Sequence, residues 1–90
     1  MKTREEFKCF ARESAYRNGF DFISVCCYNM LNNGANLKAV KRYLSGIIKN
    51  HEWLLNKPIN DPIYTVRDKE RFQVIFNISR ALWDFLMEVE

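Results

Sequence analysis

One histidine and three cysteines are the side chains of this sequence best suited to metal or nucleophilic chemistry. They are His51, Cys9, Cys26 and Cys27. A zinc site needs several such ligands at short, regular spacings, such as Cys-x-x-Cys or His-x-x-x-His, and the sequence contains neither pattern. We therefore expect no metal, no cofactor and no catalytic residues in this chain.

The surroundings of His51 and of the adjacent cysteines favour structural roles. His51 falls within a row of apolar residues, which predicts a half-buried imidazole with one ring nitrogen hydrogen bonded. A general base, a nucleotide contact, or a small ligand held in a crevice beside His51 are the alternatives. Cys26 and Cys27 belong to the apolar segment "FISVCCYNML", where burial disfavours the reactive thiolate. Packing is therefore favoured over a redox or nucleophilic role.

Start and stop signals divide the chain into four helices joined by short turns. Each expected start carries a side chain that can cap the free amides of a first helical turn, namely Thr3, Asp21, Asn36 and Thr65. Three ends are marked by glycine or proline, at Gly19, Gly34 and Pro58. The fourth helix is expected to run from about Val66 to Met87, after the loop "KPINDPIY". The pattern predicts an all-α fold, a compact four-helix bundle, with residues 1–90 forming a single domain.

Composition limits the classes of function. The 90 residues are 48% hydrophobic and 14% aromatic, enough for a packed core. No apolar run reaches the ~18 residues of a membrane span, and "MKTREEFKCF" lacks the apolar core of a signal peptide. An odd number of cysteines favours reduced thiols and a cytoplasmic location. The net charge of +3 permits an acidic partner without requiring one.

The third expected helix has an apolar row on one side, which includes Val40 and Leu44, and basic residues on the other. The basic side contains Lys38, Lys41, Arg42 and Lys49, and a solvated face is its simplest interpretation. Trp53 also falls on this side, close to Arg42 and Lys49. Either the segment "NKPINDP" folds back over its ring, or the ring is an exposed anchor that binds a protein partner or stacks on an unpaired base.

The second and fourth expected helices have more apolar surface than a surface helix needs. The second helix is apolar nearly all round, which predicts an interior position. The fourth has one apolar stripe that includes Val74 and Leu82, and a second that contains Phe72, Phe76, Trp83 and Met87. Either a central position covers both stripes, or the second stripe packs against another chain. A two-fold homodimer through the fourth helix is the expected form of such a contact.

Residues 33–46, "NGANLKAVKRYLSG", combine a glycine turn, a small apolar residue, a helix cap and two core positions. In these fourteen residues the chain locally resembles the turn and recognition helix of lac-repressor-type helix-turn-helix proteins. The resemblance implies DNA binding, with the major groove contacted by Leu37, Lys38, Lys41 and Arg42. Outside this stretch the likeness ends. Asn29 and Asn33 replace apolar residues of the motif, and the helical pattern continues about ten residues beyond Gly46.

These features favour a non-catalytic function. We expect a small cytoplasmic binding protein that acts as an accessory regulator or inhibitor by occupying a protein partner, of the kind that a phage or mobile element carries. Its expected contact residues are Trp53, Arg42, Lys49, Phe76 and Trp83. The alternative is a helix-turn-helix transcriptional regulator that binds nucleic acid through Lys38, Lys41 and Arg42.

Overall fold

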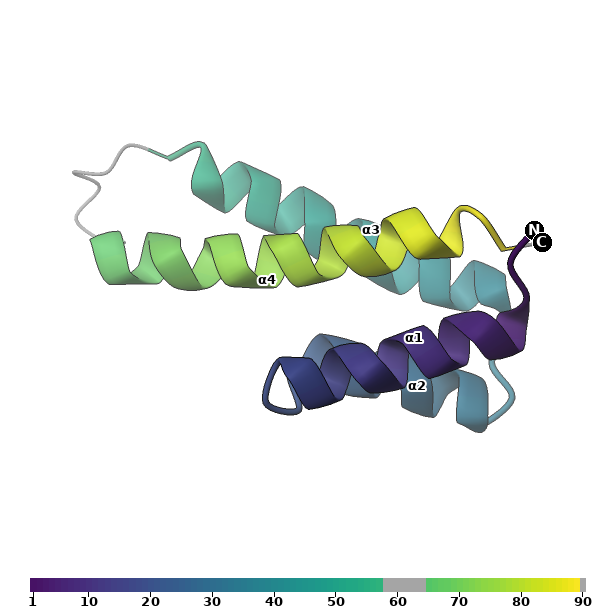
Figure 1. Ribbon diagram of the computed structural model, residues 1–90. Helices are drawn as coiled ribbons and strands as arrows, with labels where there is room; N and C mark the ends of the chain where they lie inside the picture. Colours follow the sequence, from purple (N-terminus) through teal and green to yellow (C-terminus); the bar gives the residue numbers. More distant parts are fainter. Residues whose placement is uncertain (58–64, 90) are drawn as a thin grey trace.

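The computed structural model describes residues 1–57 and 65–89, and four helices make up most of these residues (Figure 1). They are α1 (Arg4–Arg17), α2 (Phe22–Asn32), α3 (Leu37–Leu55) and α4 (Val66–Leu86). The predicted all-α four-helix bundle is confirmed. Residues 58–64 of the predicted loop lie outside the described residues.

Each helix begins directly after its predicted cap. The Thr3 hydroxyl accepts a hydrogen bond from the amide of Glu6 at 3.1 Å, and the Glu6 carboxylate accepts one from the amide of Thr3 at 3.2 Å. Thr65 and Asp68 form the same reciprocal pair at the start of α4. Asp21 and Asn36 cap α2 and α3 with single side-chain bonds. These bonds satisfy amides that a helix start leaves free, so local sequence fixes where each helix begins.

The helices form two antiparallel hairpins of unequal length. α1 packs against α2 and α3 packs against α4, and the longer α3–α4 hairpin extends well past the end of the α1–α2 pair (Figure 1). At 1.5 Å per residue, α4 is about 31 Å long and α1 only about 21 Å. The two chain ends lie side by side, where the amide of Lys2 donates to the carbonyl of Glu88 at 3.2 Å.

The core lies where the two hairpins overlap. Its buried cluster takes residues from all four helices: Phe7, Ala11, Ile23, Cys27, Leu31, Val40, Leu44, Ile78, Leu82, Leu86 and Val89. The members from α3 and α4 all lie in the halves nearest the chain ends. The outer half of the α3–α4 hairpin therefore projects beyond this cluster.

Three details of the fold differ from, or add to, the sequence-based expectations. α2 is not an interior helix, because Phe22 on its first turn is 60% exposed. Val74 was expected in the buried stripe of α4 but is 56% exposed, because α1 and α2 do not reach that end of the hairpin. α3 runs without a break through Gly46, although glycine costs about 1 kcal/mol relative to alanine inside a helix.

Candidate partner-binding surfaces

Four of the exposed residues of α3 share one side of that helix, which we name the outer face of α3. They are Lys38, Arg42, Lys49 and Trp53. At 100° per residue these positions fall within an arc of about 60°. The face is basic, since Glu52 is the one acidic residue in α3. Three of the predicted partner contacts, Arg42, Lys49 and Trp53, therefore lie on one surface.

Trp53 is the large apolar side chain of this face, and its ring is 58% exposed. The ammonium of Lys57 lies 4.1 Å from the ring centroid, in cation–π contact. Such a contact at an exposed site contributes only about 0.5–1 kcal/mol. The contact orients the ring but leaves Trp53 mostly exposed. Cover by residues 58–64 lies outside the described residues.

A lysine from the neighbouring helix fixes the end of α3 that carries Trp53. The ammonium of Lys69 in α4 donates to the carbonyl of Leu54 and, at 2.8 Å, to that of Lys57. Carbonyls in the last turn of a helix lack helical partners, and a cation there also opposes the helix dipole. α3 has no basic residue in its own last turn, so Lys69 supplies this cap and joins the two helices near Trp53.

The other two predicted contact residues lie on α4 and are less accessible. Phe76 and Trp83 are both half-buried, and Trp83 packs against the core cluster. In the same stripe, Phe72 makes an edge-on contact with His51, with ring centroids 5.9 Å apart, while Met87 is 56% exposed. The second stripe of α4 is thus not one continuous exposed surface. Partner binding by Phe76 and Trp83, and a homodimer through α4, stay predictions.

The helix-turn-helix likeness does not extend to the length of α3, and DNA binding stays a prediction. Lys38 and Arg42 are exposed, and Lys41 is half-buried. Leu37, for which the likeness implied a groove contact, instead packs against the core cluster. α3 has 19 residues and continues far beyond Gly46.

The turn between α2 and α3 is held by α1. The guanidinium of Arg4 donates to the carbonyls of Leu31 and Ala35 at 2.8 and 3.1 Å. Both carbonyls sit at the end of α2 and in the turn that follows, where backbone acceptors need partners from outside the helix. The orientation of α3 against α2 therefore depends on α1 as well.

His51 has the half-buried, hydrogen-bonded environment predicted for it. Its Nδ1 donates to the carbonyl of Ile47 at 2.9 Å. Burial raises the pKa of the Cys27 thiol to about 12, which keeps this sulfur protonated and unreactive, whereas Cys9 is exposed. Within residues 1–57 and 65–89, histidine, cysteine and carboxylate side chains form no cluster of three that could bind a metal.

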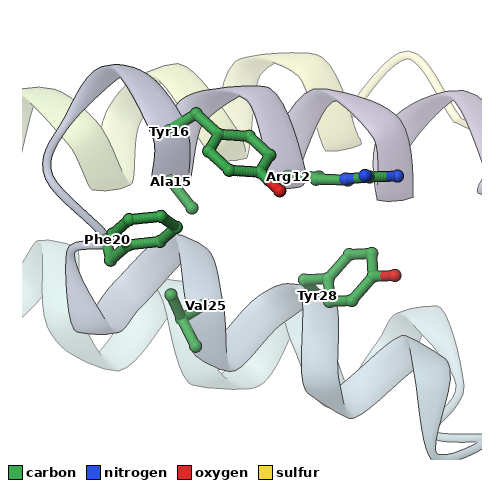
Figure 2. Close-up of a pocket in the computed structure, with 6 residues that line it drawn as sticks. All are labelled: Arg12, Ala15, Tyr16, Phe20, Val25 and Tyr28. Atoms are coloured by element: carbon green, nitrogen blue, oxygen red, sulfur yellow. The ribbon is translucent and has the colours of Figure 1, made fainter.

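A cavity of about 350 Å³ between α1 and α2 was not foreseen from the sequence (Figure 2). Its lining residues are Arg12, Ala15, Tyr16, Phe20, Val25 and Tyr28. The rings of Tyr16 and Phe20 meet edge-on, with centroids 5.3 Å apart. The available signal was an aromatic residue placed directly after Asn18 and Gly19, where a polar turn residue would be more usual.

The backbone of Phe20 is strained. α1 ends in a Schellman motif, in which the amide of Phe20 donates to the carbonyl of Ala15 at 2.6 Å and Gly19 has φ +65°. Phe20 also has φ +59°, a left-handed conformation that costs a residue with a side chain about 1–2 kcal/mol. Phe20 is nevertheless 65% exposed, so little burial within the chain offsets this cost.

In the part of the chain that the structure describes, we find no helix that could cross a membrane. Comparison of the chain with protein-family models, with curated proteins and with solved structures gives no match in any of the three.

Proposed function

We propose that this chain is a non-catalytic binding protein that recognises an acidic surface of a protein partner through the outer face of α3. In this proposal the chain acts as a regulator or inhibitor, because it acts only by binding to a surface of the partner. The observation that supports this proposal most strongly is the exposed side chain of Trp53 on the same face as Arg42 and Lys49.

The energetics of Trp53 favour a contact residue. Tryptophan and arginine dominate the binding energy of protein interfaces when they enter a desolvated contact. A large aromatic side chain has roughly 150–250 Å² to bury. Covering the exposed part of this ring is worth about 2–4 kcal/mol at 25 cal/mol per Å².

The charge of the face favours an acidic partner. Lys38, Arg42 and Lys49 lie on it, and Lys57 adds a fourth cation beside the indole. Complementary charge chiefly speeds association and selects the partner, whereas the apolar centre slows dissociation. The expected interface therefore has Trp53 and Lys57 at one end, and Lys49, Arg42 and Lys38 extend it along α3.

Affinity capture with matched variants tests this proposal. The wild-type chain should retain a specific protein from the source cell, and Trp53→Ala and the double variant R42Q/K49Q should lose it. Arg80→Gln is the control, because Arg80 is an exposed cation on α4 whose ion pair with Asp84 is also exposed. Retention of the same protein by Trp53→Ala and by the control would contradict the proposal.

A nucleic-acid-binding regulator is the second candidate, favoured by the exposure of Lys38 and Arg42 beside the turn at Gly34. Phosphate contacts release counterions, so binding to DNA or RNA should weaken steeply between about 50 and 200 mM salt. Fluorescence anisotropy with a labelled mixed-sequence duplex and a labelled single strand measures this. Absence of binding at the lower salt concentration would exclude this candidate.

A further inference from the structure

The cavity between α1 and α2 has aromatic walls, an apolar floor and a cationic rim. Ala15 and Val25 form its floor, and the rings of Tyr16, Phe20 and Tyr28 stand around it (Figure 2). Its volume of about 350 Å³ lies at the lower end of the range for ligand sites, roughly 300–1,000 Å³. The space suits one large side chain and its neighbours rather than an extended cofactor.

The left-handed backbone conformation of Phe20 lowers the stability of the fold. Glycine would adopt φ +59° without strain, yet a phenylalanine occupies this position and its ring stays mostly exposed. Backbone strain of this kind is concentrated at ligand-binding positions, where the surrounding structure holds a side chain ready for contact. The edge-on contact with Tyr16 fixes the ring as one wall of the cavity.

The one charged residue among the described residues that line the cavity is a cation, Arg12, and a second cation, Lys8, lies beside the lining residue Tyr28. The guanidinium of Arg12 lies 5.8 Å from the ring centroid of Tyr16, and the ammonium of Lys8 lies 5.4 Å from that of Tyr28. A side-chain hydrogen bond with Tyr16 also raises the pKa of Arg12. None of the six described lining residues is acidic, so these cations have no carboxylate within the cavity wall.

We propose that this cavity binds a short segment of a protein partner in which an aromatic side chain stands next to a carboxylate. The aromatic ring enters between Phe20, Tyr16 and Val25, where edge-on and stacked ring contacts are available. The carboxylate meets Arg12, whose planar guanidinium is suited to a paired hydrogen bond with two oxygens. This site is on the α1–α2 hairpin and does not depend on the outer face of α3.

Nuclear magnetic resonance titration with a defined peptide tests the proposal. The probe is a hexapeptide blocked at both ends, with one tryptophan between two aspartates. Two matched peptides replace either both aspartates by asparagine or the tryptophan by alanine. The expected result is a saturable shift of the Tyr16, Phe20 and Tyr28 ring signals with the first peptide, and binding at least about tenfold weaker with each of the others.

Two variants separate binding from folding. Arg12→Gln removes the cation, and Phe20→Gly removes the ring while suiting the local backbone, so both should fold and both should weaken binding at least about tenfold. Arg80→Gln, which makes the same change of charge on α4, should bind as the wild type does.

Three outcomes would overturn the proposal. One is the absence of a saturable shift at millimolar peptide, and another is equal binding of the asparagine peptide. The third is a response confined to Trp53 and Lys49, which would support the outer face of α3 and leave the cavity without a ligand. The ring signals of Tyr16, Phe20 and Tyr28 therefore test the cavity. Partner capture by the Trp53 variants tests the outer face of α3, so either proposal can fail alone.

Discussion

The hydroxyl oxygens of Ser14 and Ser24 lie 2.7 Å apart in the interior between α1 and α2. Both residues are buried, and the side-chain amide of Asn18 donates to the Ser14 hydroxyl and to the Ser14 carbonyl. These bonds join the end of α1 to the start of α2 beside the strained turn at Phe20. The rigidity of the α1–α2 cavity therefore depends on a buried polar contact as well as on apolar packing.

Replacing one of these serines should destabilise the fold more than its volume suggests. Ser24→Ala leaves the Ser14 hydroxyl without this partner, at a cost of about 1–3 kcal/mol in the free energy of unfolding. The double variant S14A/S24A should cost less than the sum of the two single variants, as measured by urea denaturation. If the loss in the double variant equals the sum of the two single losses to within about 0.3–0.5 kcal/mol, the two hydroxyls do not stabilise each other.

Two replacements of Phe20 should differ in stability. Phe20→Gly and Phe20→Ala both remove the exposed ring, but only glycine is free of strain at φ +59°. The glycine variant should be the more stable by about 1 kcal/mol, as seen in the midpoint of thermal unfolding. Equal stability of the two variants, or a more stable alanine variant, would mean that Phe20 is not left-handed in solution.

Stability should fall at alkaline pH because of Cys27. An unfolded cysteine ionises near pH 8.5, whereas burial raises the pKa of Cys27 to about 12 in the fold. The neutral Cys27 thiol therefore adds its full share to the free energy of unfolding below about pH 8.5. This share is lost between about pH 8.5 and pH 12, at up to about 1.4 kcal/mol per pH unit. Burial also raises the pKa of Tyr43, which acts in the same direction at higher pH.

Denaturant unfolding of the wild type and Cys27→Ala at pH 8, 9 and 10 measures this dependence. The variant is expected to be less stable at pH 8 but to lose less stability as the pH rises. Parallel curves for the two proteins would show that the Cys27 thiol is not held neutral in the folded state.

The two tryptophans should differ in fluorescence quenching. Trp53 is 58% exposed, whereas Trp83 is half-buried against the core. Trp53→Phe should remove the red-shifted component that iodide quenches, and Trp83→Phe should leave that component in place. If Trp53→Phe leaves iodide quenching unchanged, the indole is covered in solution.

Local signals in the sequence predicted the helices well. Caps such as Thr3 and Asn36 act within one turn through bonds to their own backbone, so neighbouring residues suffice to locate each helix start. The apolar row of α3 likewise predicted buried residues such as Val40 and Leu44. His51 was also correctly predicted as half-buried, because its position in that row and one backbone acceptor determine its environment.

Relationships between helices could not be predicted in this way. The exposure of Val74 follows from the shorter reach of α1 and α2, which depends on how the two hairpins are aligned. The periodicity that placed Trp83 with Phe76 as a partner contact does not reveal that Trp83 packs on the core. The α1–α2 cavity was missed because residues from two helices and a left-handed phenylalanine form it. The periodicity of a single helix reveals neither the packing between two helices nor the left-handed backbone.

The affinity of the captured partner for the wild type and for Trp53→Ala tests the central claim most directly. Isothermal titration calorimetry at moderate salt measures both dissociation constants, with Arg80→Gln as the control and unchanged helical circular dichroism as the check on folding. We predict that Trp53→Ala binds at least about tenfold more weakly, because a hot-spot residue contributes more than about 1.4 kcal/mol. Equal dissociation constants for the wild type and Trp53→Ala would contradict recognition through the outer face of α3.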